Sequence, residues 1–552
     1  MTTKICSNCQ QPFDLTDEHL GFYKKLEVPE PTHCPDCRQQ RRLAWCNERK
    51  LYKRECDLTH KPILSCYTPD VTFPVYYVKE WWSDKWDPIS FGQEYDFAKP
   101  FFDQWANLNK KVPRSSLNVS YSSLENSEYV NYAGNLKNCY LIFDTDYSRD
   151  CYYGYTVNKS TNAVDCLKVN GCEICYECID CNNCYNLKFG INCRNCNDSW
   201  FLKNCIGCNN CFGCANLERK QFCMYNQQLT QEEYKKKIAE INTGSFSTMV
   251  GLKQYVRSAY LSFPNKDMRG FQNENCTGDG LFNCKDTQDS YDCLHCHECK
   301  HCYSMSFGTK TSHDIYQFGE NIECCYENTV IGYGGFNLKF SHTCNMGNNN
   351  LSYCQDCMGS KNCFGCIGLR HKQYCILNKQ YTEEKYNELL PQIIEQMTRT
   401  GEWGEYFPIQ LSNFAYNQTT AQEYYPLTRE QALEKGYKWL DDDKKEFRPG
   451  TCQAPDDINQ TQDLITNETL ACTTCGKNYK IIPQELKFYK QIPLPIPQRC
   501  PDCRHMDRMY MRNPRHLWNR VCAKCNTAIK TTYAPEKPDI VYCEKCYLET
   551  IG

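Results

Sequence analysis

Pairs of cysteines separated by two residues recur near both ends of this 552-residue chain. The pentapeptide CPDCR stands at residues 34–38 and again at 500–504, and each copy follows an upstream C-x2-C pair. Two such pairs about 25 residues apart are typical of a tetrathiolate zinc site, because zinc takes four tetrahedral ligands. A C-P-x-C pair also occurs in thiol oxidoreductases, but the second pair favours metal. The predicted ligands are Cys6, Cys9, Cys34 and Cys37 in the first module, and Cys472, Cys475, Cys500 and Cys503 in the second.

The two ends are copies of one module. The residues between the ligands also agree, because Phe22-Tyr23-Lys24 matches Phe488-Tyr489-Lys490 at the same offset as the cysteines. The match continues beyond the last ligand, where Arg42 and Arg54 correspond to Arg508 and Arg520. Both ends should therefore fold alike, with the last two ligands at the start of a helix.

A third site follows in the C-terminal copy alone. Its predicted ligands are Cys522, Cys525, Cys543 and Cys546. The same offset maps them onto Cys56, Thr59, Tyr77 and Glu80, so the N-terminal ribbon has lost three of its four ligands. We expect that ribbon to be held by packing, with aromatic residues such as Trp81 and Trp82 available, and we expect three structural zinc ions in all.

The terminal pattern, CxxC…FYK…P.P..CPDCR…R, resembles a probable zinc-ribbon (treble-clef) domain family. With WWSDKWDP, NCFGC and QEYYPLT, the whole layout is similar to a long uncharacterised bacterial group that has zinc modules at both ends and a cysteine-rich repeat middle. The resemblance covers nearly the entire chain. It implies zinc binding at the matched cysteines and implies no activity.

The centre is a second duplication. NCFGCANLERKQFC begins at Asn210, and NCFGCIGLRHKQYC begins at Asn362. Each half starts with a helix-like segment, continues as a stretch rich in Cys, Asn, Tyr and Gly, and closes with a helix that Thr230 or Thr382 should cap. In the first half Cys151, Cys172, Cys193 and Cys214 are evenly spaced by 21 residues. This spacing predicts a β-solenoid with one coil per 21 residues and these cysteines in an inward column.

Three interpretations of the central cysteines remain open. They form a ladder of reduced, packed thiols, since cysteine behaves as a small residue that buries well; or they bind further zinc; or they form disulfides. The runs CEICYECIDCNNC and CLHCHECKHC resemble metal clusters, and His295, His297 and His301 in the second run are possible ligands.

The predicted fold class is mainly β with short helices, with a duplicated, solenoid-like centre flanked by treble-clef and zinc-ribbon modules. The predicted domains are a zinc module with a degenerate second ribbon (1–90), two solenoid halves that each begin with a helix (91–242 and 243–398), a connector (399–470) whose last part, 451–470, is a flexible linker, and a module with two zinc sites (471–552).

Composition narrows the function further. The net charge is −3, and no stretch approaches the length of a membrane span. Paired cysteines in a long chain without a recognisable signal peptide indicate a reducing, cytoplasmic environment. The sequence contains no HExxH, P-loop or GxSxG motif, and a zinc ion with four thiolate ligands has no open position for catalysis. We therefore expect no enzyme activity, small-molecule substrate or membrane partner.

The sequence favours a zinc-binding scaffold that presents a repeat surface to an unidentified protein or RNA partner. One alternative is nucleic-acid binding through the C-terminal module, whose basic residues outnumber its acidic ones. A second alternative is a thiol-rich buffer for metal or oxidant. The candidate nucleic-acid contacts are Arg504, Arg508, Arg512, Arg515 and Arg520.

Overall fold

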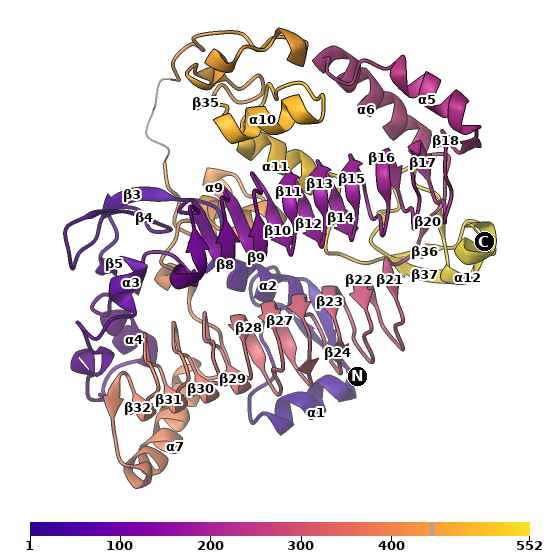
Figure 1. Ribbon diagram of the computed structural model, residues 1–552. Helices are drawn as coiled ribbons and strands as arrows, with labels where there is room; N and C mark the ends of the chain where they lie inside the picture. The colour runs from indigo at the N-terminus through magenta and orange to yellow at the C-terminus, as the bar shows by residue number, and fades with distance from the viewer. Residues whose placement is uncertain (442–446, 552) are drawn as a thin grey trace.

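The computed structural model describes residues 1–441 and 447–551, and two β-solenoids lie side by side at its centre (Figure 1). Within each solenoid the strands of neighbouring coils pair in parallel, and an antiparallel pair of strands closes each solenoid. The fold is therefore mainly β with short helices, with a duplicated solenoid centre and a cysteine-rich module at each end, as predicted. The connector predicted at 399–470 includes residues 442–446, which lie outside the described part of the chain.

The first solenoid follows the short strand β6 (Arg114–Ser115) and the 3-10 helix η2 (Tyr121–Ser123). Its strands are β7 (Leu124–Glu125), β8 (Val130–Lys137), β9 (Ile142–Arg149), β10 (Tyr155–Asn158), β11 (Thr161–Val164), β12 (Leu167–Asn170), β13 (Glu173–Tyr176), β14 (Ile179–Asn182), β15 (Tyr185–Lys188), β16 (Asn197–Lys203), β17 (Phe212–Ala215), β18 (Cys223–Met224) and β19 (Gln227–Gln228).

The second solenoid follows β20 (Asn265–Lys266). Its strands are β21 (Gly270–Phe271), β22 (Gly278–Phe282), β23 (Ser290–Leu294), β24 (Cys296–His297), β25 (Tyr303–Ser306), β26 (Thr309–Lys310), β27 (His313–Gly319), β28 (Tyr326–Gly332), β29 (Phe336–Lys339), β30 (Asn349–Ser352), β31 (Lys361–Phe364), β32 (Gln373–Ile376) and β33 (Lys379–Gln380).

Each coil of the first solenoid is a small square. Leu167 pairs with Ile179, so successive coils are 12 residues apart. Every third residue from Tyr132 to Tyr225 has a positive φ and makes a corner, and the residue after it faces the interior. Asn and Asp adopt this left-handed conformation more readily than most residues. This preference accounts for the many Asn and Asp residues at corners, where side-chain amides of adjacent coils are hydrogen-bonded to each other.

The predicted coil length of 21 residues is wrong. Because interior positions recur every third residue, any multiple of three aligns cysteine with cysteine, and 12 and 21 share this property. The four evenly spaced cysteines, Cys151, Cys172, Cys193 and Cys214, do face inward and are at most 1% exposed. However, each lies on a different side of the square, so they form no column. The real columns join residues one coil apart, such as Cys184, Cys196 and Cys208.

The interior thiols also serve as hydrogen-bond donors. Cys193 Sγ lies 3.4 Å from the carbonyl oxygen of Ile191 and 3.5 Å from that of Leu202, and its proton can be donated to either. Ser148 occupies an equivalent interior position and donates to carbonyl groups at the same sequence separations. Cysteine and serine thus bury small side chains that can donate a hydrogen bond, while aliphatic residues such as Leu187 and Leu202 fill other interior positions.

Helices precede and close each solenoid, as predicted. Thr230 forms a capping box with Glu233 at the start of α5, and Thr382 accepts the backbone N–H of Lys385 at the start of α7. In sequence, α4 (Phe101–Asn109) and α5 (Gln231–Ala239) flank the first solenoid, and α6 (Phe246–Tyr260) and α7 (Glu383–Thr400) flank the second. In space, α4 packs against the second solenoid and α6 against the first.

The terminal modules have matching elements. In the N-terminal module these are β1 (Thr2–Ile5), β2 (Pro12–Leu15), α1 (Asp17–Lys25), α2 (Pro35–Leu43), β3 (Tyr52–Glu55), β4 (Pro62–Ser65), β5 (Val75–Tyr76), α3 (Val78–Trp81) and the 3-10 helix η1 (Pro88–Phe91). In the C-terminal module they are β34 (Leu470–Ala471), β35 (Asn478–Tyr479), α10 (Pro483–Gln491), α11 (Pro501–Tyr510), β36 (Trp518–Val521), β37 (Ala528–Thr531), β38 (Val541–Tyr542) and α12 (Glu544–Ile551).

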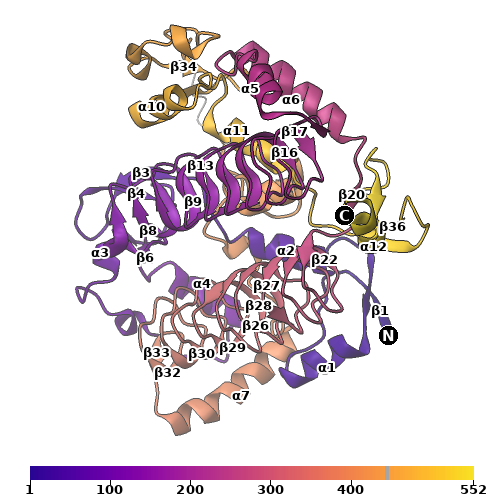
Figure 2. The same cartoon turned by 45° about the vertical axis from the view of Figure 1, so that its right-hand side comes forward.

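The first half of each module lies on the solenoid that is farther away in sequence (Figures 1 and 2). Helix α2 contacts β27 and β28 of the second solenoid, whereas α11 contacts β12 of the first. The second half of each module lies on the solenoid that is nearer in sequence. In the N-terminal module β5 pairs with β6, and in the C-terminal module β38 pairs with β20, each at the start of that nearer solenoid. Each module therefore bridges both solenoids, and the two halves of the molecule are related by an approximate two-fold arrangement.

The solenoids also contact each other through matched polar pairs. Lys168 of the first solenoid binds Asp292 of the second at 2.6 Å, and Gln317 of the second donates to Asp144 of the first. Asp144 and Asp292 occupy corresponding corners of the two repeats. The reciprocal pairing supports the two-fold arrangement.

The connector packs against both halves. It contains the 3-10 helices η3 (Ile409–Leu411), η4 (Tyr416–Gln418), η5 (Ile458–Gln460) and η6 (Asp463–Thr466), and the helices α8 (Thr420–Tyr424) and α9 (Arg429–Glu434). Residues 451–470 were predicted to be a flexible linker, and this is wrong. Ile458 and Ile465 are buried in the core that the first solenoid shares with the C-terminal module, and Asp456 accepts hydrogen bonds from Ser245 and Ser247.

Candidate metal centres

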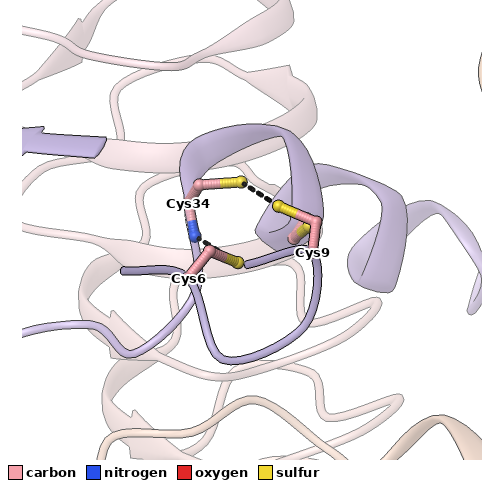
Figure 3. Close-up of side chains that lie close together, drawn as sticks. Cys6, Cys9 and Cys34 are labelled. Atoms are coloured by element: carbon pink, nitrogen blue, oxygen red, sulfur yellow. Dashed lines mark hydrogen bonds between the residues drawn. The ribbon is translucent and has the colours of Figure 1, made fainter. Parts of the chain in front are cut away.

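The twelve predicted ligands form three clusters of four cysteines, as the spacing indicated. In every cluster the four sulfur atoms lie within 4.8 Å of one another. In the first cluster Cys9 Sγ is 3.7 Å from Cys34 Sγ, and the backbone N–H of Cys34 donates to Cys6 Sγ at 3.2 Å (Figure 3). The corresponding sulfur–sulfur distances are 3.6 Å between Cys475 and Cys500, and 3.8 Å between Cys525 and Cys543. Each cluster can hold one metal ion.

The turn at each first cysteine pair has a defined cause. The residue after the second cysteine has a positive φ in all three cases: 61° at Gln10, 74° at Gly476 and 60° at Asn526. Its backbone N–H donates to the carbonyl group of the first cysteine at 2.9–3.0 Å. Gly and Asn adopt this conformation at low cost. The turn brings both sulfur atoms to the same side of the chain.

A helix presents the second cysteine pair of each cluster. Cys34 and Cys500 are the N-cap residues of α2 and α11, and each is followed by proline at the first helical position, where the missing N–H costs nothing. The fourth ligand, Cys37 or Cys503, lies in the first turn of the same helix. In the third cluster α12 begins directly after Cys543 and contains Cys546.

At least one thiol in each cluster has a lowered pKa. A hydrogen bond from the Cys37 thiol is the main cause at Cys34, whose pKa is lowered to about 5. Burial raises the pKa values of Cys472 and Cys522, but backbone N–H groups, chiefly those of Cys500 and Cys543, outweigh it and lower both to about 6. Thiolate is the form that binds metal, and the lowered pKa values favour it at these cysteines, whereas burial raises the pKa of others in the clusters, such as Cys503 and Cys546.

The turn at Cys56 keeps the backbone hydrogen bond of the other three turns, although Cys56 is the one ligand that remains there. The backbone N–H of His60 donates to the carbonyl group of Cys56 at 2.8 Å, and the N–H of Tyr77 donates to Cys56 Sγ at 3.2 Å. Thr59 and Glu80 supply no sulfur, and Glu80 forms an ion pair with Lys85. The ribbon is held by a packed cluster of Tyr67, Phe73, Val75 and Phe414, as expected, whereas Trp81 belongs to the neighbouring core.

The central cysteines are packed thiols. All 45 cysteines of the chain are free, so the disulfide interpretation is wrong. Among the described residues, the three terminal clusters are the groups of His, Cys, Asp and Glu that can hold a metal ion, and no central cysteine belongs to them. His295 stacks on Phe307 and His301 stacks on His19 instead of meeting the sulfur atoms.

The five candidate nucleic-acid arginines are engaged within the chain. Arg504 and Arg508 both bind Asp165, a fully buried corner residue of the first solenoid. Arg512 joins Asp180 of the first solenoid to Asp292 of the second at 3.1 and 2.6 Å, and Arg515 binds Asp292 at 3.2 Å. The fifth, Arg520, donates to two backbone carbonyl groups. These guanidinium groups hold the C-terminal module against both solenoids.

The N-terminal module repeats this contact at the corresponding residues. Arg38 binds Asp314 at 2.8 Å, and Arg42 binds the same carboxylate at 3.2 Å. Burial raises the pKa of Asp314, but Arg38 and Arg42 outweigh it, so the pKa is lowered overall. Sequence reasoning missed Asp165 and Asp314 as the partners. The signal was present, because both arginines recur at the module offset and both aspartates occur in the duplicated centre.

Comparison with known proteins assigns no family to this chain. No protein-family model matches it, and no curated protein is significantly similar to it. One solved structure, a protein from Desulfovibrio desulfuricans G20 described provisionally as an acetyltransferase, matches 50% of this chain and 81% of its own length. The identity is 7% and the TM-score is 0.10, so this likeness carries no argument.

The helices are short or amphipathic. Among the described residues, none is both long enough and apolar enough to span a membrane.

Proposed function

We propose that this protein is a non-enzymatic scaffold in which three structural zinc ions fix the terminal modules against a duplicated solenoid. One observation carries the proposal: the sulfur–sulfur distances of 3.6–3.8 Å within the clusters. Four sulfur atoms at about 2.3 Å from a tetrahedral zinc ion are about 3.8 Å apart. The clusters therefore match zinc, and the modules correspond to treble-clef and zinc-ribbon units.

The role assigned to zinc is structural. Four thiolates complete the coordination sphere and leave no position for water or substrate. Binding energy at such a site becomes folding energy, because the unfolded chain has no preformed cluster. In the first two clusters zinc holds the second cysteine pair at the start of a helix, α2 or α11, whose arginines contact the solenoids, so it supports the assembly as a whole. Reduced thiols and zinc thiolates fit a cytoplasmic setting.

The exposed surface favours a protein partner. Tyr147 of the first solenoid and Tyr333, Phe336 and Met346 of the second are between 42% and 61% exposed, and we call these four residues the solenoid patch. Burial is the main cause that raises the pKa of Tyr333, and Asp146 and Tyr147 add to it, so the two tyrosines lie near each other. Large exposed apolar side chains that gather in this way are typical of interaction surfaces.

The two alternatives have less support. Nucleic-acid binding required free arginines, but Arg504, Arg508, Arg512 and Arg515 have side chains at most 7% exposed. A thiol buffer requires accessible sulfur, but nearly all interior cysteines of the solenoids are fully buried. Nucleic-acid binding and thiol buffering therefore remain proposals with less support than the scaffold.

Capture from native lysate tests the proposal. Tagged full-length protein should retain a protein partner after nuclease treatment, and the variant with Tyr147→Ser and Tyr333→Ser should lose it. Tyr185→Ser, which changes another exposed tyrosine of the first solenoid, serves as the control. Loss of all captured material after nuclease would instead favour the nucleic-acid alternative.

A further inference from the structure

A cavity of about 520 Å³ lies outside the metal centres. It forms where the tryptophan-rich segment 81–88 covers one corner of the second solenoid at residues 370–372. Its volume falls within the range of about 300–1,000 Å³ that is usual for small-molecule sites. The first solenoid has no such cover, because Glu218, Arg219 and Lys220, at the matching corner, are exposed.

Hydrogen bonds from Arg370 hold the segment that forms one wall of the cavity. Arg370 donates to the carbonyl groups of Trp81, Ser83 and Trp86 at 3.1–3.3 Å. Its guanidinium group also lies 5.1 Å from the ring centre of Trp86, and Trp86 Nε1 donates to the carbonyl group of Trp81 at 2.7 Å. The segment is thus fixed before any ligand arrives, which lowers the entropic cost of binding.

The cavity presents balanced charge and unused polar groups. Asp84 and Asp87 line it together with Arg370 and Lys372, and His371 adds an imidazole ring. Within the described part of the chain, no group donates a hydrogen bond to the Asp84 carboxylate, and Lys372 forms no ion pair. An anion would meet the two carboxylates, and a cation would meet Arg370 and Lys372. A neutral ligand avoids both conflicts.

We propose that this cavity binds a neutral saccharide. The half-buried indole ring of Trp82 offers an apolar surface for the C–H face of a sugar ring, whereas the ring of Trp86 is buried and lies beneath Arg370. The Asp84 carboxylate accepts hydrogen bonds from hydroxyl groups, and Lys372 and His371 donate to them. Few ligands other than sugars combine an apolar face, no net charge and a ring of hydroxyl groups. The inference is independent of the partner and the zinc content proposed above.

Saturation-transfer difference NMR and tryptophan fluorescence test the proposal on the full-length, zinc-loaded protein. The probes are a panel of neutral mono- and disaccharides that includes cellobiose, maltose, lactose and N,N′-diacetylchitobiose. We expect at least one to bind with a Kd of about 1 mM or tighter. Trp82→Ala and Asp84→Asn should each weaken that binding at least tenfold, while Arg219→Ala at the uncovered corner should leave it unchanged.

Asp84 is exposed, so its variant tests the site without disturbing the fold; unchanged zinc content and circular dichroism will verify this. The proposal fails if no saccharide of the panel binds, or if both variants bind as tightly as the wild type. Saturable binding of tetramethylammonium or of inorganic phosphate in place of the sugars also overturns it, because either result would show a site for a charged ligand.

Discussion

Cysteine suits the interior of both solenoids because it is small, buries well and can donate a hydrogen bond. Each side of a coil in the first solenoid has three residues, and its one interior side chain is often a donor to a backbone carbonyl group, such as Cys193, and elsewhere an aliphatic residue, such as Leu187 or Leu202. This geometry explains the three-residue spacing of the cysteines, which is awkward for a strand of period two. Their function in the solenoids is packing, whereas the same residue type binds metal at the ends.

Substitution of Cys193 tests this role. Cys193→Ala removes the sulfur atom and its hydrogen bond, and it should cost on the order of 1 kcal/mol because the cavity it leaves is small. Cys193→Ser keeps a donor for the carbonyl groups of Ile191 and Leu202, so it should cost less. Urea unfolding gives the stabilities, and elemental analysis should find the same zinc content in both. A loss of one zinc ion per chain would show that the solenoid binds metal.

A buried glutamate at the junction of the solenoids should make stability depend on pH. Glu48 is 2% exposed and accepts hydrogen bonds from Tyr155 and Tyr316. Burial is the main cause that raises its pKa to about 8. The native state therefore keeps the Glu48 carboxyl group protonated, whereas the unfolded state releases this proton above the ordinary pKa of glutamate, about 4.3. The stability from this group is complete below that value and is lost as pH rises towards 8.

Glu48→Gln removes this titration and keeps a hydrogen-bonding group for both tyrosines, because the amide oxygen accepts from one hydroxyl group and the amide NH2 donates to the other. From pH 5 to pH 8 the wild type should lose stability relative to the variant by about 1.4 kcal/mol per pH unit at most. Urea unfolding at both pH values measures the difference, with the exposed Glu434→Gln as the control. A difference that stays constant across this range would mean that Glu48 is ionised in the native protein.

At the scale of elements, the sequence predicted the features that depend on residues close together in the chain. The ligand spacing gave all three clusters, and the offset between the ends predicted the degenerate ribbon at Cys56. Thr230 and Thr382 cap their helices as expected. The coil length could not be found from cysteine spacing, because interior residues recur every third position and several periods match. The packing of residues 451–470 was also missed, because polar sequence does not reveal the tertiary contacts of Ile458 and Ile465.

Helix α11 should depend on the buried carboxylate beneath it. Arg504→Met leaves Asp165 with one of its two partners, and removal of one partner from a buried ion pair usually costs about 3–5 kcal/mol. Adding Asp165→Asn should recover part of that loss, because the buried charges that remain, on Arg508 and Glu485, then balance each other. The matched pair in the N-terminal module is Arg38→Met with Asp314→Asn.

A double-mutant cycle from urea unfolding supplies the coupling energy of each pair. The two cycles should agree in sign and be similar in size, since the modules dock alike. A coupling energy near zero in either cycle would show that the ion pair does not hold that module on the solenoid.

At the scale of the whole molecule, the two halves depend on each other. The first half of each module lies on the distant solenoid, and the polar pairs Lys168–Asp292 and Gln317–Asp144 join the solenoids directly. Neither half is complete alone, because α2 and α4 have their apolar partners in the second half. No pattern within one module reveals this crossing, since it arises only from contacts between distant segments.

Separate expression of the halves tests the crossing. Residues 1–242 and 243–552, produced together as two chains, should purify as a one-to-one complex, because each fragment carries a module that docks on the other. Size-exclusion chromatography with multi-angle light scattering measures the assembly. Recovery of two well-folded, monomeric fragments that do not associate would refute the mutual dependence.

The central claim is that metal is confined to the ends. Elemental analysis of the full-length protein, purified under reducing conditions, combined with zinc-edge X-ray absorption, tests it most directly. The account predicts three zinc ions per chain, one for each cluster, each with four sulfur ligands at about 2.3 Å. Cys503→Ser should lower the count by one. More than three zinc ions, or a first shell that contains nitrogen or oxygen, would contradict the account and assign metal to the solenoids.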